Sequence, residues 1–324
     1  MTIFKFGITM ALSFSALAPA WSADKADAYP QRAIKLVVPF PAGSTTDTMT
    51  RFLSEKVAPE LKQSLVVENK AGAQGGIAAA DVSRAAPDGY TLLVGTNSTQ
   101  AANVHLFKNL PYNPAKDFVA ITQFTMNPLV LVVHPDLPAK DLAQFLDYAK
   151  VRPGELNYGV GNTGSLAAVQ MLKSMTGIQA MDIQYAGTPQ AITDLIAGRL
   201  DFMITDISVT RPYIEAGKLR ALAVTPIKPT KALPDTPTFD KAGLKGYEFV
   251  ACGGLFAPAG TDPAIINKLN QAFVKALNSP EAAQFLGQQG LEPAPKTPDQ
   301  FNQYVADQTV MWGKLIEDAG IPKK

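Results

Sequence analysis

Residues 34–58 read IKLVVPFPAGSTTDTMTRFLSEKVA, and this stretch decides how the chain is organised. An apolar run at 34–39 stops at a small, hydroxyl-rich loop, and a helical pattern follows, which Pro59 is expected to end. The helix carries its apolar residues on one face: Met49, Phe52, Leu53 and Val57. A loop placed between a strand and a helix points backbone N–H groups and hydroxyls at the space above the helix N-terminus. The stretch therefore predicts a strand–loop–helix unit with an anion site at its tip.

The same design returns at residues 156–177, which read LNYGVGNTGSLAAVQMLKSMTG. Its helix has the apolar stripe Leu166, Val169, Leu172 and Met175, and Gly177 is expected to end it. The two units share a design and not an alignable repeat. Because they lie more than a hundred residues apart, they predict two lobes that close on one small acid. A third helix is expected from TPQAITDLIAG, with Thr188 as N-cap, Pro189 in the first turn and Gly198 at the end.

Composition excludes several classes of protein. The 324 residues carry a formal net charge of +1, and Lys and Arg are scattered singly, so no nucleic-acid partner is expected. An anion would be held by dipoles and hydroxyls more than by bulk charge. His105 and His134 show no metal-ligand spacing, so no metal site is predicted. No cofactor is expected either. Cys252, the only cysteine, lies in an apolar strand pattern typical of a core residue; the alternative is a nucleophile.

The N-terminal 22 residues are expected to be a secretory signal. Lys5 precedes a mostly apolar run at 8–17, and small residues follow, with cleavage after Ala20 or after Ser22. The alternative is a membrane anchor, but the run is short for a span of about 20 residues. The chain is therefore predicted to be exported to the periplasm.

Apolar runs of strand length recur, with helical patterns between them, and predict an α/β fold with mostly parallel sheets. The expected strands are 34–39, 65–68, 91–95, 129–134, 156–160, 181–184, 202–205, 220–225 and 249–256. Two long helical patterns follow, at 263–289 and 297–319.

The chain is expected to cross between lobes twice, near 125–128 and in the Pro-rich stretch around 226–237. Residues 24–124 and 249–324 would then form the first lobe, and residues 125–248 the second. Two crossings make a hinge that allows the lobes to open and close.

Several stretches, in this order, resemble one known family. They include YPQRAIKLVVPFPAGSTTDTMTR, VENKAGAQGGIAAADVSRAAPDGYTLLVGT, RPGELNYGVGNTGS, QYAGTPQAITDLIAGRLDFM and LFAPAGTDPAIINKLN. Almost end to end, the chain is similar to the Bug-type solute receptors of tripartite tricarboxylate transporters. The resemblance implies a type II periplasmic-binding-protein fold, no catalysis, a small carboxylate as ligand and membrane permease subunits as partners. A monomer is expected.

The resemblance also implies a set of binding residues in the loops that follow the strands. In the family, backbone amides of two loops and ordered waters typically hold the ligand's proximal carboxylate. The positions carried over are Phe40, Ala42, Gly43, Ser44, Thr45, Asp47, Thr96, Asn97, Ser98, Gly161, Asn162, Thr163, Ser165, Tyr185, Ala186, Gly187 and Asp206.

Two positions depart from the family pattern. Ser44 replaces the second of two glycines, and Ala168 stands where a His often follows the second loop. Both changes disfavour citrate-like acids, and they favour aromatic dicarboxylates such as terephthalate or linear ones such as adipate.

Some roles stay open on the sequence alone. Asp47 either contacts the ligand or orients its loop from the first helical turn. Asp206 either faces the ligand or lies in a solvent-facing turn, and Arg211 either pairs with a second carboxylate or stays on the surface. Phe40 and Tyr185 are candidates to line an apolar slot, although Phe40 fits the core equally well. The GVGNTG at 159–164 matches a dinucleotide fingerprint, but an exported chain meets little of that cofactor.

Two other functions compete with transport. One is an exported hydrolase, which would need a nucleophile close to His105 or His134. The other is a ligand sensor that signals to a membrane kinase.

Overall fold

The stretch that opens the sequence argument forms β1 (Ile34–Val38), a loop and α2 (Thr45–Leu61). The computed structural model describes residues 28–318 and 320–323, so the expected signal peptide and both cleavage positions lie outside it. The sequence predicts that Pro59 ends α2, but Pro59 lies in the last turn of the helix. The helix continues to Leu61, and its C-cap is Lys62, whose φ is 53°. A proline there removes one hydrogen bond at the end of the ladder, which the last turn tolerates.

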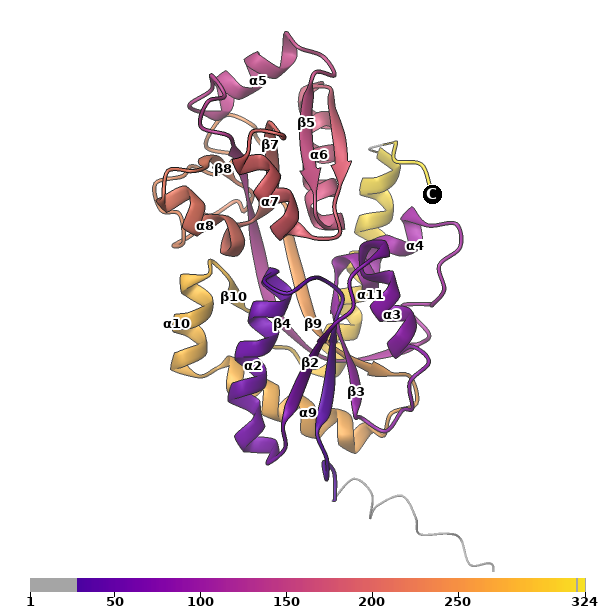
Figure 1. Ribbon diagram of the computed structural model, residues 1–324. Helices are drawn as coiled ribbons and strands as arrows, with labels where there is room; N and C mark the ends of the chain where they lie inside the picture. Colours follow the sequence, from indigo (N-terminus) through magenta and orange to yellow (C-terminus); the bar gives the residue numbers. More distant parts are fainter. Residues whose placement is uncertain (1–27, 319, 324) are drawn as a thin grey trace, which may run out of the picture.

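One sheet organises the lower half of the molecule in Figure 1. β1 lies between β2 (Leu65–Asn69) and β3 (Thr91–Thr96), and both pairs are parallel. The sheet continues through β9 (Val250–Pro258) to the first part of β4 (Phe118–Val133), and the short β10 (Glu292–Pro293) pairs with β4. This lobe also contains the helical segments η1 (Ala73–Gly75), α3 (Gly76–Val82), η2 (Ser98–Ala102), α4 (Asn103–Leu106), α9 (Pro263–Leu277) and α10 (Pro280–Gln288).

A second sheet forms the upper lobe. It uses the last residues of β4, which lie between β7 (Phe202–Asp206) and β8 (Arg220–Val224). Beyond β7 lie β5 (Leu156–Val160) and β6 (Ala180–Gln184), both parallel to their neighbours. The helices of this lobe are α5 (Leu142–Lys150), α6 (Thr163–Thr176), α7 (Thr188–Ile196) and α8 (Ile207–Glu215).

The strand β4 belongs to both sheets. Its residues up to Pro128 pair with β9, and from Leu129 onward they pair with β7, so the first crossing lies inside one strand. The expected strand at 129–134 is therefore only its second half. The chain returns beside this crossing, where Leu129 N donates to Thr225 Oγ1 at 2.9 Å and Phe249 N donates to Thr225 O at 3.2 Å.

Two further sequence expectations need correction. The sheets are mixed and not mostly parallel, because the crossing strands β4 and β9 run antiparallel to their neighbours. The helical pattern at 263–289 is two helices, since Ser279 caps α10 by accepting from Ala282 N at 3.1 Å and Pro280 occupies its first turn.

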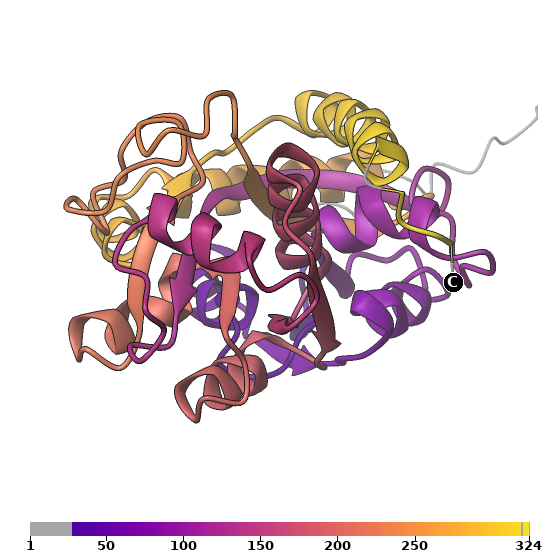
Figure 2. The same cartoon turned by 90° about the horizontal axis from the view of Figure 1, so that it is seen from above.

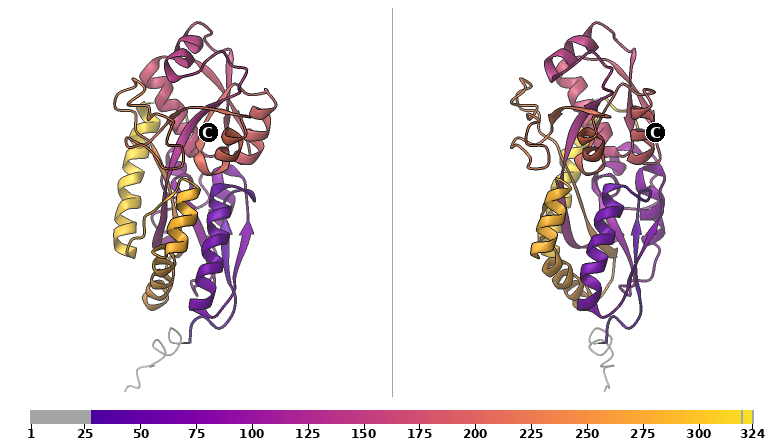
Figure 3. Two further views of the ribbon diagram at one scale, coloured as in Figure 1. Left: turned by 90° about the vertical axis from the view of Figure 1, so that its left-hand side faces the viewer. Right: turned by 60° about the vertical axis from the view of Figure 1, so that its left-hand side comes forward.

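The C-terminal helix α11 (Pro298–Asp318) runs beside both lobes, in yellow in Figures 2 and 3. Phe301 packs against Phe256 of β9, with ring centroids 5.0 Å apart. Farther along, the fully buried Trp312 meets Phe249 edge to face at 5.5 Å, within an apolar cluster that includes α6. Within residues 28–318 and 320–323, no helix combines the length and the apolar character needed to span a bilayer.

Candidate functional site

The carboxyl ends of strands from both lobes meet at one cavity, which has a volume of about 40 Å³. Ligands of open α/β sheets gather at such ends. β1 and β3 reach it from the lower lobe, and β5, β6 and β7 reach it from the upper lobe. We call this space the interlobe cavity. Eight predicted site residues line it: Phe40, Ser44, Thr45, Thr96, Asn97, Ser98, Asn162 and Asp206.

Among the described residues, four α-helices begin at the interlobe cavity: α2, α6, α7 and α8, whose N-cap is Asp206. Ser44 is the N-cap of α2 and accepts from Asp47 N at 3.3 Å, while Asn162 caps α6 and accepts from Ser165 N at 2.8 Å. The sequence predicts Thr188 as the N-cap of α7, but the N-cap is Gly187. Thr188 is the first residue of the helix, and it lines the cavity. The first N–H groups of each helix have no acceptor inside the helix and lie at its positive end. The cavity is therefore suited to an anion.

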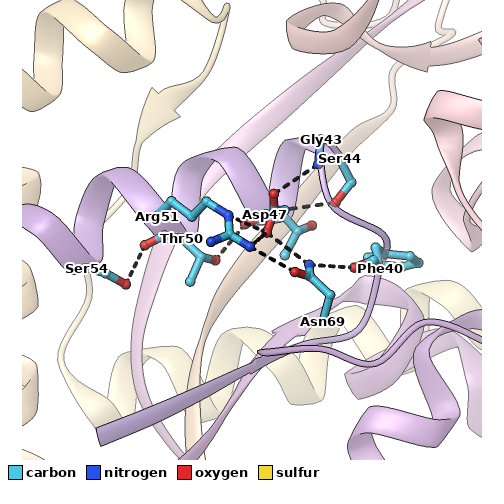
Figure 4. Close-up of polar contacts among 9 residues, drawn as sticks. Phe40, Gly43, Ser44, Asp47, Thr50, Arg51, Ser54 and Asn69 are labelled. Carbon is cyan, nitrogen blue, oxygen red and sulfur yellow. Dashed lines mark hydrogen bonds and ion pairs between the residues drawn. The ribbon is translucent and has the colours of Figure 1, made fainter. Parts of the chain in front are cut away.

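Asp47 holds the loop between β1 and α2 through hydrogen bonds, as Figure 4 shows. One carboxylate oxygen accepts from Gly43 N at 2.9 Å, and the other accepts from Arg51 Nε at 3.0 Å and Asn69 Nδ2 at 2.9 Å. Asn69 also donates to Phe40 O at 2.9 Å. Burial acts to raise the pKa of Asp47, but the hydrogen bonds from Arg51, Gly43 and Asn69 outweigh it and hold the pKa below its usual range. The carboxylate fixes the loop and does not line the cavity.

Asp206 is the one acidic side chain among the described residues that line the interlobe cavity. It is only 6% exposed, and Asn162 Nδ2 lies 3.4 Å from its Oδ2. Burial raises the pKa of Asp206 to about 6, against a smaller lowering by hydrogen bonds. A carboxyl group in this position titrates close to neutral pH, so its charge bears directly on any bound anion.

The other predicted residues lie around the interlobe cavity and do not line it. One of them, Gly43, lines a second cavity beside it. Thr163 N donates to Ser98 Oγ at 3.3 Å, so this residue joins the two lobes. Tyr185 Oη donates to Asp194 Oδ2 at 2.8 Å, and Tyr185 does not line the cavity. The remaining residues of this set are Ala42, Gly161, Ser165, Ala186 and Gly187.

Two glycines permit close approach of loops near the site. A Cβ on Gly161 would lie 2.4 Å from Thr188 N and 2.6 Å from Thr188 Cα, so only glycine lets the α6 and α7 N-termini approach this closely. A Cβ on Gly187 would meet Pro41 Cδ of the other lobe at 2.5 Å. These positions shape the site without presenting a side chain to it.

The lobes are in direct contact around the cavity. Thr45 Oγ1 and Ser208 Oγ lie 2.6 Å apart. On another side, Gln74 Nε2 donates to Gln184 Oε1 at 3.2 Å, and Thr163 Oγ1 lies 3.3 Å from Gln74 Oε1. These contacts describe a closed arrangement.

Six further residues complete the lining: Thr46, Asn127, Gly164, Thr188, Ala251 and Cys252. Thr46, Gly164 and Thr188 adjoin predicted residues in the helix first turns, so the same signal could have found them. Asn127, Ala251 and Cys252 come from the crossing strands β4 and β9, and their sequence carries no loop signal.

The hydrolase alternative finds no support in this site. His105 Nε2 is 2.9 Å from Thr309 O, His134 Nδ1 accepts from Asp136 N at 3.2 Å, and neither histidine lines the cavity. Burial raises the pKa of the Cys252 thiol to about 12, which suits the core role and not a thiolate nucleophile. In the described part of the chain, no group of three or more His, Cys, Asp or Glu side chains could hold a metal ion.

Arg211 stays away from the interlobe cavity. Its Nε donates to Glu215 Oε1 at 2.7 Å, and its Nη1 donates to the carbonyl of Gln288 at the end of α10. The guanidinium therefore has partners on the surface of the molecule.

Two α/β sheets that share β4, with a cavity between the ends of their strands, are typical of a solute-binding protein. The family model TctC, described as the tripartite tricarboxylate transporter family receptor, matches residues 49–321 of this chain. BugT of Bordetella pertussis is 35% identical, over 92% of this chain and 93% of that protein. The solved structure of R. palustris Rpa4515 with adipate is 33% identical, with a TM-score of 0.89, over 91% of this chain and 100% of that one. MatC from Rhodopseudomonas palustris with bound malate is 33% identical, with a TM-score of 0.83, over 89% and 100%.

The chain belongs to the TctC family of tripartite tricarboxylate transporter receptors. This confirms the resemblance to Bug-type receptors and the periplasmic-binding-protein fold. The family is periplasmic, and its members are solute-binding proteins and not enzymes.

Proposed function

We propose that this chain captures a small carboxylate in the interlobe cavity and delivers it to the permease subunits of a tripartite tricarboxylate transporter. The observation that carries the proposal is the meeting of the α2, α6 and α7 N-termini at one cavity. Helix N-termini bind anions through free N–H groups and the helix dipole. The related structures with adipate and malate support the same ligand class.

The remaining expectations belong to this proposal. Residues 24–124 and 249–324 form one lobe, residues 125–248 form the other, and a cleaved signal directs a monomer to the periplasm. The ligand is a mono- or dicarboxylate, with terephthalate and adipate as candidates. Signalling to a membrane kinase would use the same capture step, and loss of uptake in cells that lack the permease distinguishes transport from sensing.

Thr45 offers a sharp test because it is the first residue of α2 and lines the cavity. Thr45→Pro removes its N–H, and the extended backbone of Ser44 (φ −70°, ψ 158°) accommodates a following proline. Thr45→Val removes the hydroxyl but keeps the N–H, so it is the matched control.

Isothermal titration with acetate, hexanoate, benzoate, adipate, malate and terephthalate measures the effect. A hydrogen bond to a charged group contributes about 1.5–3 kcal/mol. Thr45→Pro is therefore expected to weaken acid binding by about 10-fold or more beyond the effect of Thr45→Val. Equal affinities in the two variants, or binding of neutral sugars or amines with no acid bound, would contradict the proposal.

A further inference from the structure

A second, larger cavity lies beside the interlobe cavity, and Thr45 lines both. Its volume is about 200 Å³, and we call it the side cavity. α2 and α10 of the lower lobe form one wall and contribute Met49 and Phe285; α7 and α8 of the upper lobe form the other and contribute Ile192 and Val209. Phe285 is held in place by stacking on Phe52 with ring centroids 4.0 Å apart.

The two volumes indicate that a ligand larger than a carboxylate group needs both spaces. The interlobe cavity, at about 40 Å³, has room for a carboxylate group or a few waters. An apolar cavity of roughly 150 Å³ is enough to hold a benzene ring. A carboxylate at the helix N-termini can therefore extend its hydrocarbon part into the side cavity if the 2.6 Å contact between Thr45 and Ser208 separates.

The charge of the two linings distinguishes between kinds of acid. Of the described residues that line either cavity, none is Lys, Arg or His. Arg211, the sequence candidate for a second carboxylate, is bound to Glu215 and to the end of α10. A second carboxylate inside the side cavity would lose its hydration without gaining a cation, which is unfavourable. The lining also contains the uncharged polar residues Thr45, Thr48, Ser208, Tyr213 and Gln289, but most of its surface is apolar and favours a hydrocarbon end.

We infer that the preferred ligand is a monocarboxylic acid whose apolar end occupies the side cavity, between α2 and α10 on one side and α7 and α8 on the other. This rests on the proposed function and narrows its ligand class. Because the hydrocarbon end touches both lobes, its contacts replace the Thr45–Ser208 contact in holding the lobes together. The residues of the side cavity then determine chain length and polarity, whereas the helix N-termini determine that the ligand is an acid.

The test compares acids that differ only in the part assigned to the side cavity. Calorimetry with acetate, butanoate and hexanoate is expected to show affinity rising about fourfold per added CH₂, the equivalent of about 0.8 kcal/mol for each buried CH₂. Hexanoate and adipate have the same number of carbons, and adipate adds the second carboxylate. Hexanoate is expected to bind at least 10-fold more tightly.

Two substitutions of Val209, which is half-buried on α8, alter the side cavity in opposite ways. Val209→Trp fills it and is expected to weaken hexanoate at least 10-fold while changing acetate less than twofold. Val209→Lys adds the missing cation and is expected to shift preference at least 10-fold toward adipate. Val310→Trp, at a position 75% exposed on α11, is the matched control, and thermal unfolding verifies that each variant folds.

The outcomes separate the two proposals. If none of the acids binds, the proposed function fails, and this inference fails with it. If acids bind but adipate equals hexanoate, or affinity does not depend on chain length, the function stands and the side-cavity inference is overturned. Unchanged hexanoate affinity in Val209→Trp also overturns it.

Discussion

Asp206 should make ligand affinity depend on pH. Its carboxyl group lines the interlobe cavity, is 6% exposed and has a pKa raised to about 6, chiefly by burial. Above that pKa it carries a negative charge beside the bound carboxylate, and like charges close together repel. Cys252, the other ionisable group of the described lining, has a pKa raised to about 12 and stays neutral at working pH. Asp206→Asn removes the charge and keeps the shape.

The magnitude follows from the protonated fraction. With a pKa of about 6, Asp206 is protonated in about 76% of molecules at pH 5.5 and in about 3% at pH 7.5. If only the protonated form bound the acid, the apparent affinity would rise about 25-fold as the pH falls from 7.5 to 5.5, which is the upper limit for one group with this pKa over this range. The ligand itself stays mostly ionised, because ordinary carboxyl groups titrate near about 4.

The stability of the unliganded protein should change in the same direction. The pKa of Asp206 is about 6 in the folded state and 3.8 at its ordinary value, so the folded protein binds this proton more tightly. Stabilisation therefore appears as pH falls through 6, is complete below 3.8, and amounts to about 3 kcal/mol. At pH 7.5, Asp206→Asn should be more stable than the parent by up to that amount.

Calorimetry at pH 5.5, 6.5 and 7.5, with the tightest acid of the six-acid panel, measures the affinity change. Wild-type affinity should rise as pH falls, whereas Asp206→Asn should bind tightly and almost independently of pH. Asp235→Asn, at an exposed position, is the matched control and should keep the wild-type profile. A flat wild-type profile, or the same slope in Asp206→Asn, would refute the reasoning.

Two other predictions concern the scaffold of the site. Gly161→Ala places a Cβ 2.4 Å from Thr188 N, so thermal unfolding should show about 1–3 kcal/mol of destabilisation, and acid affinity should fall as the α6 and α7 N-termini separate. Gly287→Ala, with no atom within 4 Å of its Cβ, should be neutral or stabilising by up to about 1 kcal/mol. Asp47→Asn weakens the bonds to Gly43 and Arg51 and should lower the free energy of unfolding at pH 7 by about 1–3 kcal/mol. Because its pKa is lowered in the folded state, this difference should shrink as pH falls below 3.8; a constant difference would contradict the assigned role.

The strand–loop–helix units could be predicted because local signals agree with the tertiary arrangement. The apolar run before Ser44 forms β1 and the hydroxyl-rich loop caps α2, while Gly177 ends α6 with a φ of 74°. Each of these features depends on a few neighbouring residues. The sequence could therefore predict that two loop-capped helix N-termini meet at one cavity, and the resemblance added the other residues of the set.

The crossing strand could not be predicted in full, because its buried residues are polar. Thr122, Gln123 and Thr125 are 0% exposed and break the apolar pattern that predicted only the second half of β4. Burial of these side chains depends on partners far along the chain; for example, Thr122 Oγ1 donates to Lys296 O at 2.9 Å. Asn127 in the cavity lining was missed for the same reason.

The side cavity has no sequence signal, because its walls are faces of helices from different lobes. Met49 belongs to the expected apolar stripe of α2, and a pattern of this kind predicts only that a residue is buried. Whether it packs against a sheet or lines a cavity depends on how the lobes meet.

The two departures from the family pattern now carry different weight for ligand choice. Ala168 is fully buried in the apolar cluster of the upper lobe, and its carbonyl accepts from Tyr247 Oη at 2.7 Å, so it does not line the interlobe cavity. Ser44 does line it, while its hydroxyl caps α2. The case for a less polar acid therefore cannot rest on the missing histidine. It rests on Ser44, which lines the interlobe cavity, and on a side cavity whose described lining is mostly apolar surface and has no cation.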